Sequence, residues 1–207
     1  MRVGIYGGSF SPPHLGHVRL AETFLSSLEL DKLIIIPAGT PPHKMIDGGA
    51  NGAERIEMCR AAFSGISENV VISDYEAYRT DPCYTVDTLR HFSGKDELFM
   101  LCGSDMFLTL DRWRDPEGIF SLCTVVCGTR ADDEDTRNAL EDAKKRYLEV
   151  YGKDTVIMNF DPIEVSSTEV RASLKCGVRP DTIGDEVFDI IKRLGLYGYR
   201  GESSEKF

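Results

Sequence analysis

Six short apolar runs recur along the chain, separated by longer stretches in which apolar residues repeat every three to four positions. Runs such as LIIIP and LFMLC are apolar throughout, as expected of parallel strands covered on both faces. The longer stretches have the spacing of amphipathic helices. The alternation predicts an α/β fold, a Rossmann-like doubly wound parallel sheet with helices on both faces and right-handed crossovers. The predicted strands span residues 3–6, 33–36, 70–72, 98–102, 124–127 and 155–158, and the predicted helices span 16–28, 53–63, 85–92 and 134–151.

The pattern predicts a single domain over residues 1–207 that closes with a C-terminal helical part at about 166–198. Residues 183–196 form an amphipathic helix in this part, ending at Gly195. The polar residues 201–207 (GESSEKF) are expected to be disordered. Residues 37–52 are rich in proline and glycine, which indicates a long, mobile loop.

Composition and charge narrow the function classes. The 207 residues include 24 Lys and Arg against 34 Asp and Glu, which gives a formal net charge of −10. An acidic chain without a basic stripe repels the nucleic-acid backbone, so we expect no nucleic-acid partner, whereas a small anionic ligand needs only a few converging positive groups. The N-terminus does not have the apolar run of a signal peptide, and no run of about eighteen apolar residues predicts a membrane span. We therefore expect a cytoplasmic protein without a membrane partner.

The six cysteines are scattered, which indicates reduced thiols in a chain without an export signal. Cys123 and Cys127 form the close pair and share one face of a predicted strand. Buried packing fits this pair better than half a metal site, because no second pair or nearby histidine supplies the remaining ligands. No residue is assigned to a metal.

A glycine-rich turn with two histidines, GGSFSPPHLGH, joins the first predicted strand to the first predicted helix. Such a turn lets backbone N–H groups approach a phosphate at the positive end of the helix. His14 and His17 point the same way from the helix start, and Gly16 leaves room for a nucleotide against the backbone. The turn matches neither G-x-G-x-x-G nor the P-loop pattern, which disfavours hydride transfer and ATP hydrolysis. The candidate nucleotide-binding residues are Gly7, Gly8, Ser9, Phe10, His14 and His17.

Two alternatives compete with nucleotide binding at this turn. The histidines could be surface or core residues at a helix cap, or they could form half a zinc site. Zinc would need further ligands, and His43 and His91 lack the cysteine or carboxylate spacing that would complete the set. The flanking glycines and the preceding strand favour the nucleotide.

A second candidate anion site lies in VSSTEVRASL, where hydroxyl residues precede a helical run. Ser166, Ser167 and Thr168 can cap that helix, and the N–H groups of its first turn can bind an anion. Arg171 follows three residues after Thr168 on the same side of the turn. A helix cap alone remains the alternative, but together with the histidine turn the segment can form a second clamp on a polyphosphate.

These motifs resemble those of the nicotinate-nucleotide adenylyltransferases, in the HxGH nucleotidyltransferase superfamily. The resemblance covers nearly the whole chain: GGSFSPPHLGH, PPHK, ERIEMCRAA, CYTVDTL, CGSDMF, the RW pair, VSSTEVR and IIKRLGLY. The histidine and SSTxxR motifs indicate the superfamily, whereas PPHK, CYTVDTL and GSDMF with Trp113 indicate the nicotinate branch. The sequence GTRAD at 128–132 stands where the family often has Arg-Pro-Gly, so Arg130 is given no role, and Val165 replaces the usual isoleucine.

The resemblance implies transfer of the adenylyl group of ATP to nicotinic acid mononucleotide, giving nicotinic acid adenine dinucleotide and pyrophosphate in NAD biosynthesis. It implies that His17 donates to an α-phosphate oxygen, that His14 contacts the polyphosphate, and that Arg171 holds the β- and γ-phosphates. The N-terminal amides after Ser167 and Thr168 would assist Arg171. The implied cofactor is Mg²⁺, held mainly by ATP phosphates and water.

The resemblance also implies contacts for the rest of both substrates. Asp105, with Gly103 beside it, would contact the adenosine ribose, although Ser104 or Asp105 could instead be a helix N-cap. Lys44 would offer a charge to the attacking phosphate. Tyr84, Thr85 and Trp113 would surround the nicotinate ring, although a single tryptophan is more often a core residue.

Several other functions remain open from the sequence. The chain could be another transferase of the superfamily, a pantetheine-phosphate adenylyltransferase or a cytidylyltransferase, or a non-catalytic nucleotide sensor. A sensor would be expected to lack a catalytic histidine or Arg171, and the chain has all three. The sequence does not determine the oligomeric state, and a homo-oligomer remains possible.

Overall fold

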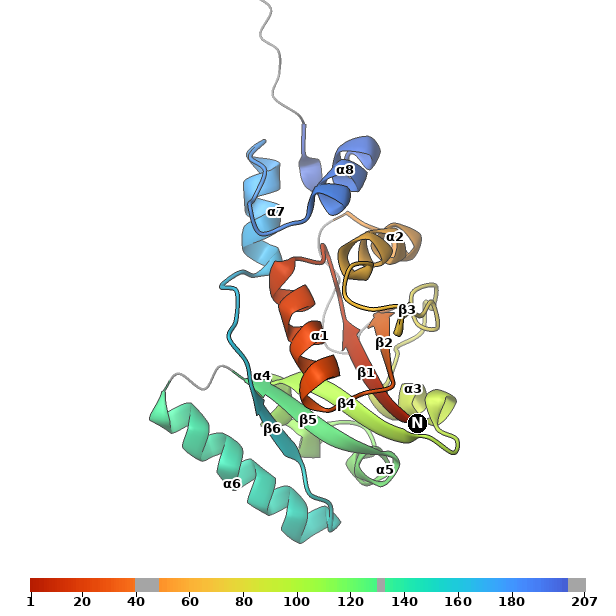
Figure 1. Cartoon of the computed structure of the whole chain (residues 1–207), viewed down its shortest axis with the longest axis vertical. Coiled ribbons are helices and arrows are strands. Elements are labelled where there is room, and N and C mark those ends of the chain that lie inside the picture. Colours follow the sequence, from red (N-terminus) through yellow and green to blue (C-terminus); the bar gives the residue numbers. More distant parts are fainter. Residues whose placement is uncertain (40–48, 130–132, 201–207) are drawn as a thin grey trace, which may run out of the picture.

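The computed structural model describes residues 1–39, 49–129 and 133–200, and within them it shows a six-stranded sheet in the order β3-β2-β1-β4-β5-β6 (Figure 1). Every pair of neighbouring strands is parallel. The predicted doubly wound sheet is therefore confirmed. The strands span Arg2–Gly8 (β1), Lys32–Pro37 (β2), Val70–Ile72 (β3), Glu97–Gly103 (β4), Cys123–Thr129 (β5) and Val156–Asn159 (β6).

Helices connect the strands and close the chain. The helices predicted at 85–92 and 134–151 are confirmed at both ends, whereas the one predicted at 183–196 is shorter, because Gly184 caps its start and Gly195, at φ +63°, ends it. The helices span Leu15–Ser27 (α1), Gly52–Phe63 (α2), Thr85–Phe92 (α3), Ser104–Phe107 (α4), Pro116–Leu122 (α5), Glu134–Tyr151 (α6), Ser167–Lys175 (α7) and Asp185–Leu194 (α8), with short 3-10 turns at Leu110–Arg112 and Leu196–Gly198.

Apolar side chains bury both faces of the sheet, as the uninterrupted apolar strands require. One face packs against α1 and α2 through residues such as Phe24 and Phe63, and the other packs against α3, α5 and α6. Cys123 and Cys127 are both buried in the second cluster, which confirms the predicted packing role. Within the described residues, no helix has the length and apolar character needed to cross a membrane.

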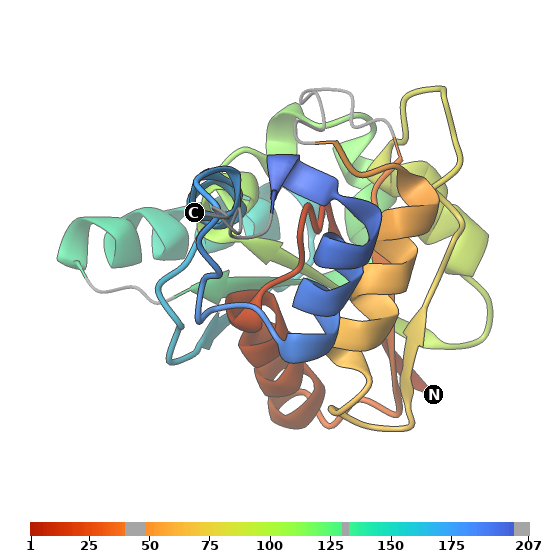
Figure 2. The ribbon, with the colours of Figure 1, turned by 90° about the horizontal axis from the view of Figure 1, so that it is seen from above.

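Helix α8 packs along α2 (Figure 2), and α7 joins the same apolar cluster. Met58 of α2 lies in one apolar cluster with Leu174 of α7 and Ile191 of α8. The segment between α7 and α8 also contacts the first helix, where the Leu15 N–H donates to the Thr182 carbonyl at 2.8 Å. This packing places the start of α7 beside the turn that follows β1.

Some predictions lie outside the described residues. These are the mobility of the loop predicted at residues 37–52, of which 40–48 are not described, the phosphate contact of Lys44, any role of Arg130, and the disorder of residues 201–207. All four stay predictions.

Candidate active site

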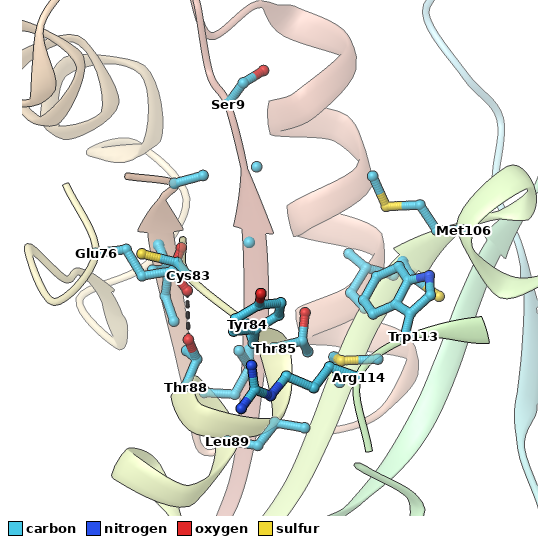
Figure 3. Close-up of a pocket in the computed structure, with 18 residues that line it drawn as sticks. Ser9, Glu76, Cys83, Tyr84, Thr85, Thr88, Leu89, Met106, Trp113 and Arg114 are labelled. Atoms are coloured by element: carbon cyan, nitrogen blue, oxygen red, sulfur yellow. Dashed lines mark hydrogen bonds between the residues drawn. The ribbon is translucent and has the colours of Figure 1, made fainter. Parts of the chain in front are cut away.

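A cavity of about 280 Å³ lies at the carboxyl ends of β1 and β4, where the strand order reverses. Open α/β sheets bind ligands at such a switch point. Residues from distant segments meet here, and the sequence analysis had identified six of the 18 residues that line the cavity (Figure 3). The predicted residues that line the cavity are Gly7, Gly8, Ser9, Tyr84, Thr85 and Trp113.

The turn after β1 is tightly folded. Phe10 adopts the left-handed region at φ +44°, and a Cβ on Gly8 would lie 2.9 Å from its ring, so position 8 must be glycine. The Phe10 ring is fully buried, with edge contacts to Tyr6, Phe63 and His17. Phe10, a predicted ATP-binding residue, can therefore offer a nucleotide only its backbone.

His14 and His17 stack face to face at the start of α1, with ring centroids 3.6 Å apart. The His14 backbone N–H donates to His17 Nδ1 at 3.2 Å, in the manner of a capping box. Because Nδ1 of His17 is an acceptor, the neutral ring carries its proton on Nε2. His17 can therefore cap the helix through Nδ1 and donate a hydrogen bond to a ligand from Nε2.

Burial keeps both histidines neutral near pH 7. Burial lowers the pKa of His14 to about 4, against the opposing effect of the Glu169 carboxylate. Burial, and then the neighbouring His14, hold the pKa of His17 well below its usual value. A neutral His17 can donate one hydrogen bond from Nε2 without carrying a charge of its own.

Gly16 lies in close packing at the histidine pair. A Cβ at this position would lie 3.0 Å from Val165 Cγ1 and 3.1 Å from His14 Nδ1. His14 Nδ1 is buried and has no hydrogen-bond partner among the described residues. The glycine thus makes room for the His14 ring and for the segment before α7. This packing role is separate from the predicted role of leaving space for a nucleotide.

The start of α7 combines a helix cap with contacts to the histidine turn. Ser166 and Glu169 form a capping box, in which the Ser166 hydroxyl accepts from the Glu169 N–H at 3.2 Å and the Glu169 carboxylate accepts from the Ser166 N–H at 2.8 Å. The Ser167 hydroxyl donates to the Pro12 carbonyl at 3.1 Å. The predicted cap is confirmed for Ser166.

Arg171 ties the same two segments together. Its guanidinium donates to the Ser11 carbonyl at 2.9 Å and to the Thr168 hydroxyl at 3.2 Å. The structure thus brings Arg171 and the histidine turn side by side, as the two-clamp hypothesis requires.

The segment after β4 presents Asp105 to solvent. Gly103 is the N-cap of α4, so the alternative in which Ser104 or Asp105 is the N-cap is wrong. Asp105 is exposed in the first turn of this short helix, beside Met106 of the cavity wall. Its carboxylate is therefore accessible to a ligand.

The cavity wall also contains residues that the sequence analysis did not identify. Arg114 lies over the Tyr84 ring, 4.4 Å from its centroid, and Glu76 accepts a 2.5 Å hydrogen bond from the Thr88 hydroxyl. Burial raises the pKa of Glu76, against the hydrogen bonds from Thr88 and from the Gly39 N–H. Neither contact has a local sequence signal, because the partners are far apart in the chain.

Trp113 has both a core role and a site role. It packs against the cluster of α3, α5 and α6 and also lines the cavity. Tyr84 is the N-cap of α3 and makes no side-chain cap hydrogen bond, while the Asp87 N–H of the first turn donates to the Tyr84 carbonyl at 3.0 Å. Tyr84 and Thr85, at the start of this helix, line the cavity. This end of the cavity combines an aromatic wall with backbone donors.

We find no group of three or more His, Cys, Asp or Glu side chains in the described part of the chain that could hold a metal ion. A divalent cation at this site would need ligands from another molecule. Phosphate oxygens and water are the ligands that Mg²⁺ commonly keeps.

Comparison with known proteins gives consistent matches. The cytidylyltransferase-like family model matches residues 5–173. A probable nicotinate-nucleotide adenylyltransferase of Clostridium acetobutylicum is 36% identical over 200 residues, which cover 93% of this chain and 97% of that protein. One from Clostridium kluyveri is 32% identical over 202 residues, covering 95% and 99%. A solved structure of Plasmodium falciparum nicotinic acid mononucleotide adenylyltransferase complexed with NaAD has a similar fold, with a TM-score of 0.74 at 16% identity, covering 96% of this chain and 98% of that one.

Proposed function

This chain belongs to the nicotinate-nucleotide adenylyltransferases, within the cytidylyltransferase-like family, and from that membership we propose that it transfers the adenylyl group of ATP to nicotinic acid mononucleotide. A phosphate oxygen of the mononucleotide attacks the α-phosphorus of ATP, and the bond to the β-phosphate oxygen breaks. The products are nicotinic acid adenine dinucleotide and pyrophosphate. Such a reaction needs positioning and charge neutralisation more than covalent catalysis.

His17 has the main transition-state role in this proposal. Its Nδ1 accepts from the His14 N–H, so its Nε2–H is directed to an α-phosphate oxygen as negative charge develops there. His14 stacks on His17 and fixes the plane of the ring. The backbone of Gly7, Gly8, Ser9 and Phe10 lies beside the polyphosphate.

Arg171 and the start of α7 hold the β- and γ-phosphates. The Arg171 guanidinium has five N–H donors, and its bonds to Ser11 and Thr168 engage only some of them. Mg²⁺ enters as the complex with ATP, held by phosphate oxygens and water. Gly103 and the exposed Asp105 would contact the adenosine ribose.

The nicotinate ring occupies the cavity beside Tyr84, Thr85 and Trp113. Trp113 stacks on the ring, and N–H groups at the start of α3 donate hydrogen bonds to its carboxylate. Lys44 would reach the attacking phosphate. The six free cysteines support a cytoplasmic location.

The observation that carries this proposal is that His17 and Arg171 both bond the turn after β1, at the His14 N–H and the Ser11 carbonyl, and that this turn continues from Ser9 of the cavity wall. The test is an assay of the purified chain with MgATP and nicotinic acid mononucleotide. We expect pyrophosphate and dinucleotide in equal amounts. Parallel reactions contain phosphopantetheine with ATP, or a polyol phosphate with CTP. Turnover in one of these reactions but not with nicotinic acid mononucleotide would contradict the proposal, as would the absence of turnover in all of them.

A further inference from the structure

A buried arginine on α2 contacts the histidine turn from behind. Arg55 is 3% exposed, and among the described residues it forms no ion pair. A buried guanidinium costs stability unless its donors are satisfied, and the Arg55 Nε has no hydrogen-bond partner within the described part of the chain. Neither the fold nor the substrate contacts described above explain this cation.

The Arg55 guanidinium donates to the Ser9 carbonyl at 3.0 Å. That carbonyl belongs to the peptide leading into Phe10, the residue at φ +44°. A bulky residue in the left-handed region is strained and persists only where surrounding contacts determine it. A charge-assisted bond to the preceding carbonyl is such a contact.

The Phe10 ring transmits this geometry to His17. Its edge meets the His17 ring at a centroid distance of 5.1 Å and an interplanar angle of 68°. Phe63, which is on α2 like Arg55, holds the same ring at 5.6 Å. A shift of the Ser9–Phe10 peptide would therefore move one of the surfaces that set the plane of the His17 ring.

The far side of the turn is held separately. Arg171 donates to the Ser11 carbonyl, and the Tyr197 hydroxyl lies 3.3 Å from the Ser11 hydroxyl. Arg55 thus bonds the Ser9–Phe10 end of the turn, whereas Arg171 and Tyr197 of the C-terminal part contact Ser11 at its other end. Loss of Arg55 should not release the whole turn.

We propose that Arg55 is a positioning residue for the reaction: its bond to the Ser9 carbonyl fixes Phe10, and Phe10 fixes the His17 ring. The inference rests on the proposed adenylyl transfer, in which His17 acts on the transition state. An interaction of this kind lowers kcat when it is lost and leaves mononucleotide binding unchanged.

Arg55→Lys keeps the cation and loses the planar fork. We expect kcat to fall at least tenfold, with KM for the mononucleotide within twofold of wild type. Arg60→Lys is the matched control, because Arg60 is exposed on the same helix, and its kinetics should equal those of wild type. An Arg55→Lys protein with wild-type kcat would overturn the proposal.

A double-mutant cycle distinguishes positioning from general support of the fold. If Arg55 acts through His17, Arg55→Lys should change kcat less than twofold in a His17→Ala background. A tenfold loss in that background would overturn the proposal. Should Arg55→Lys fail to fold, Phe10→Leu removes the ring contacts to His17, Tyr6 and Phe63 and keeps the Ser9 carbonyl, and its effect on kcat must show the same dependence on His17.

The nitrogen chemical shifts of His17 provide a readout that does not need turnover. In wild type, NMR of ¹⁵N-histidine-labelled protein should show the Nε2–H tautomer, and Arg55→Lys should shift the His17 signals and leave those of His91 in place. Unchanged His17 signals would contradict the positioning role even if adenylyl transfer itself were not observed. Shifted His17 signals in a chain without that activity would contradict only the proposed reaction.

Discussion

The two ends of the site are built differently. At the phosphate end, between Ser9 and His17, three backbone carbonyls accept hydrogen bonds from Arg55, Arg171 and Ser167. At the ring end, Tyr84 and Trp113 face a cavity, and the helix start beside them has no side-chain cap. Groups held in advance can stabilise developing charge without reorganising, whereas an apolar cavity with a few donors selects a ligand by shape. The phosphate end should therefore control the chemical step, and the ring end should control the choice of acceptor.

Burial affects the ionisable groups at the two ends in opposite directions. It lowers the pKa values of His14 and His17 and raises the pKa of Glu76. In both cases the buried environment disfavours the charged form. The histidines and Glu76 therefore give stability opposite dependences on pH.

The largest expected effect is that of His17→Ala. A donor directed at a developing oxyanion acts mainly in the transition state, so kcat should fall about 10² to 10³-fold. The folded state and mononucleotide binding should change little. Steady-state kinetics and circular dichroism of the variant check both parts, and a drop in kcat of less than threefold would remove His17 from the mechanism.

Arg171→Ala should have the next largest effect, on ATP. Loss of a charge-assisted hydrogen bond costs about 1.5–3 kcal/mol, so KM for ATP should rise about tenfold or more. KM for the mononucleotide should change much less, although kcat should also fall because the Ser11 carbonyl loses its donor. Lys175→Ala, exposed on the same helix, is the control. Equal rises in both KM values would argue against contact with the β- and γ-phosphates.

Acceptor choice should show a smaller but clear preference at the ring end. Both oxygens of a carboxylate can accept hydrogen bonds from backbone N–H donors, whereas the NH₂ of a carboxamide would face another donor. Such a mismatch costs about 1–3 kcal/mol. The wild-type kcat/KM should therefore be at least tenfold higher for nicotinic acid mononucleotide than for nicotinamide mononucleotide. Equal values would mean that the site recognises the ring and not its substituent.

The smallest expected effect is the pH dependence of stability that comes from Glu76. Because its folded-state pKa is raised, Glu76 stabilises the folded state at low pH, and this contribution is lost as pH rises from about 4.5 through the folded pKa. Glu76→Gln removes the titration. Chemical unfolding over this pH range should show that wild type loses stability relative to Glu76→Gln as pH rises, and a constant difference would contradict the raised pKa.

The sequence predicted the phosphate end better than the ring end, for physical reasons. His14, His17 and Arg171 occur in local motifs, because a strand-to-helix turn and a helix cap each bring their groups together within a few residues. Trp113 was placed by resemblance alone, and Glu76 was missed because its partner Thr88 lies on another element. The sequence around Arg55 does not indicate that this residue is buried, because an arginine within an amphipathic helix pattern is expected on the polar face.

The short elements were the hardest part of the fold to predict. The six strands were found to within about two residues, because each is an uninterrupted apolar run. The helices α4 and α5, with 4 and 7 residues, are too short to show a clear helical period. Their positions depend on packing against β4, β5 and α6, and the local pattern of apolar residues does not indicate such long-range contacts.

One binding measurement can test whether the ring end recognises the acceptor and the phosphate end controls the chemical step. Isothermal titration of nicotinic acid mononucleotide into wild type, His17→Ala and Trp113→Ala, without ATP, separates acceptor recognition from the chemical step. We expect His17→Ala to bind within twofold of wild type and Trp113→Ala to bind at least tenfold more weakly. Equal losses of affinity in the two variants, or a loss confined to His17→Ala, would contradict the separation of the two ends.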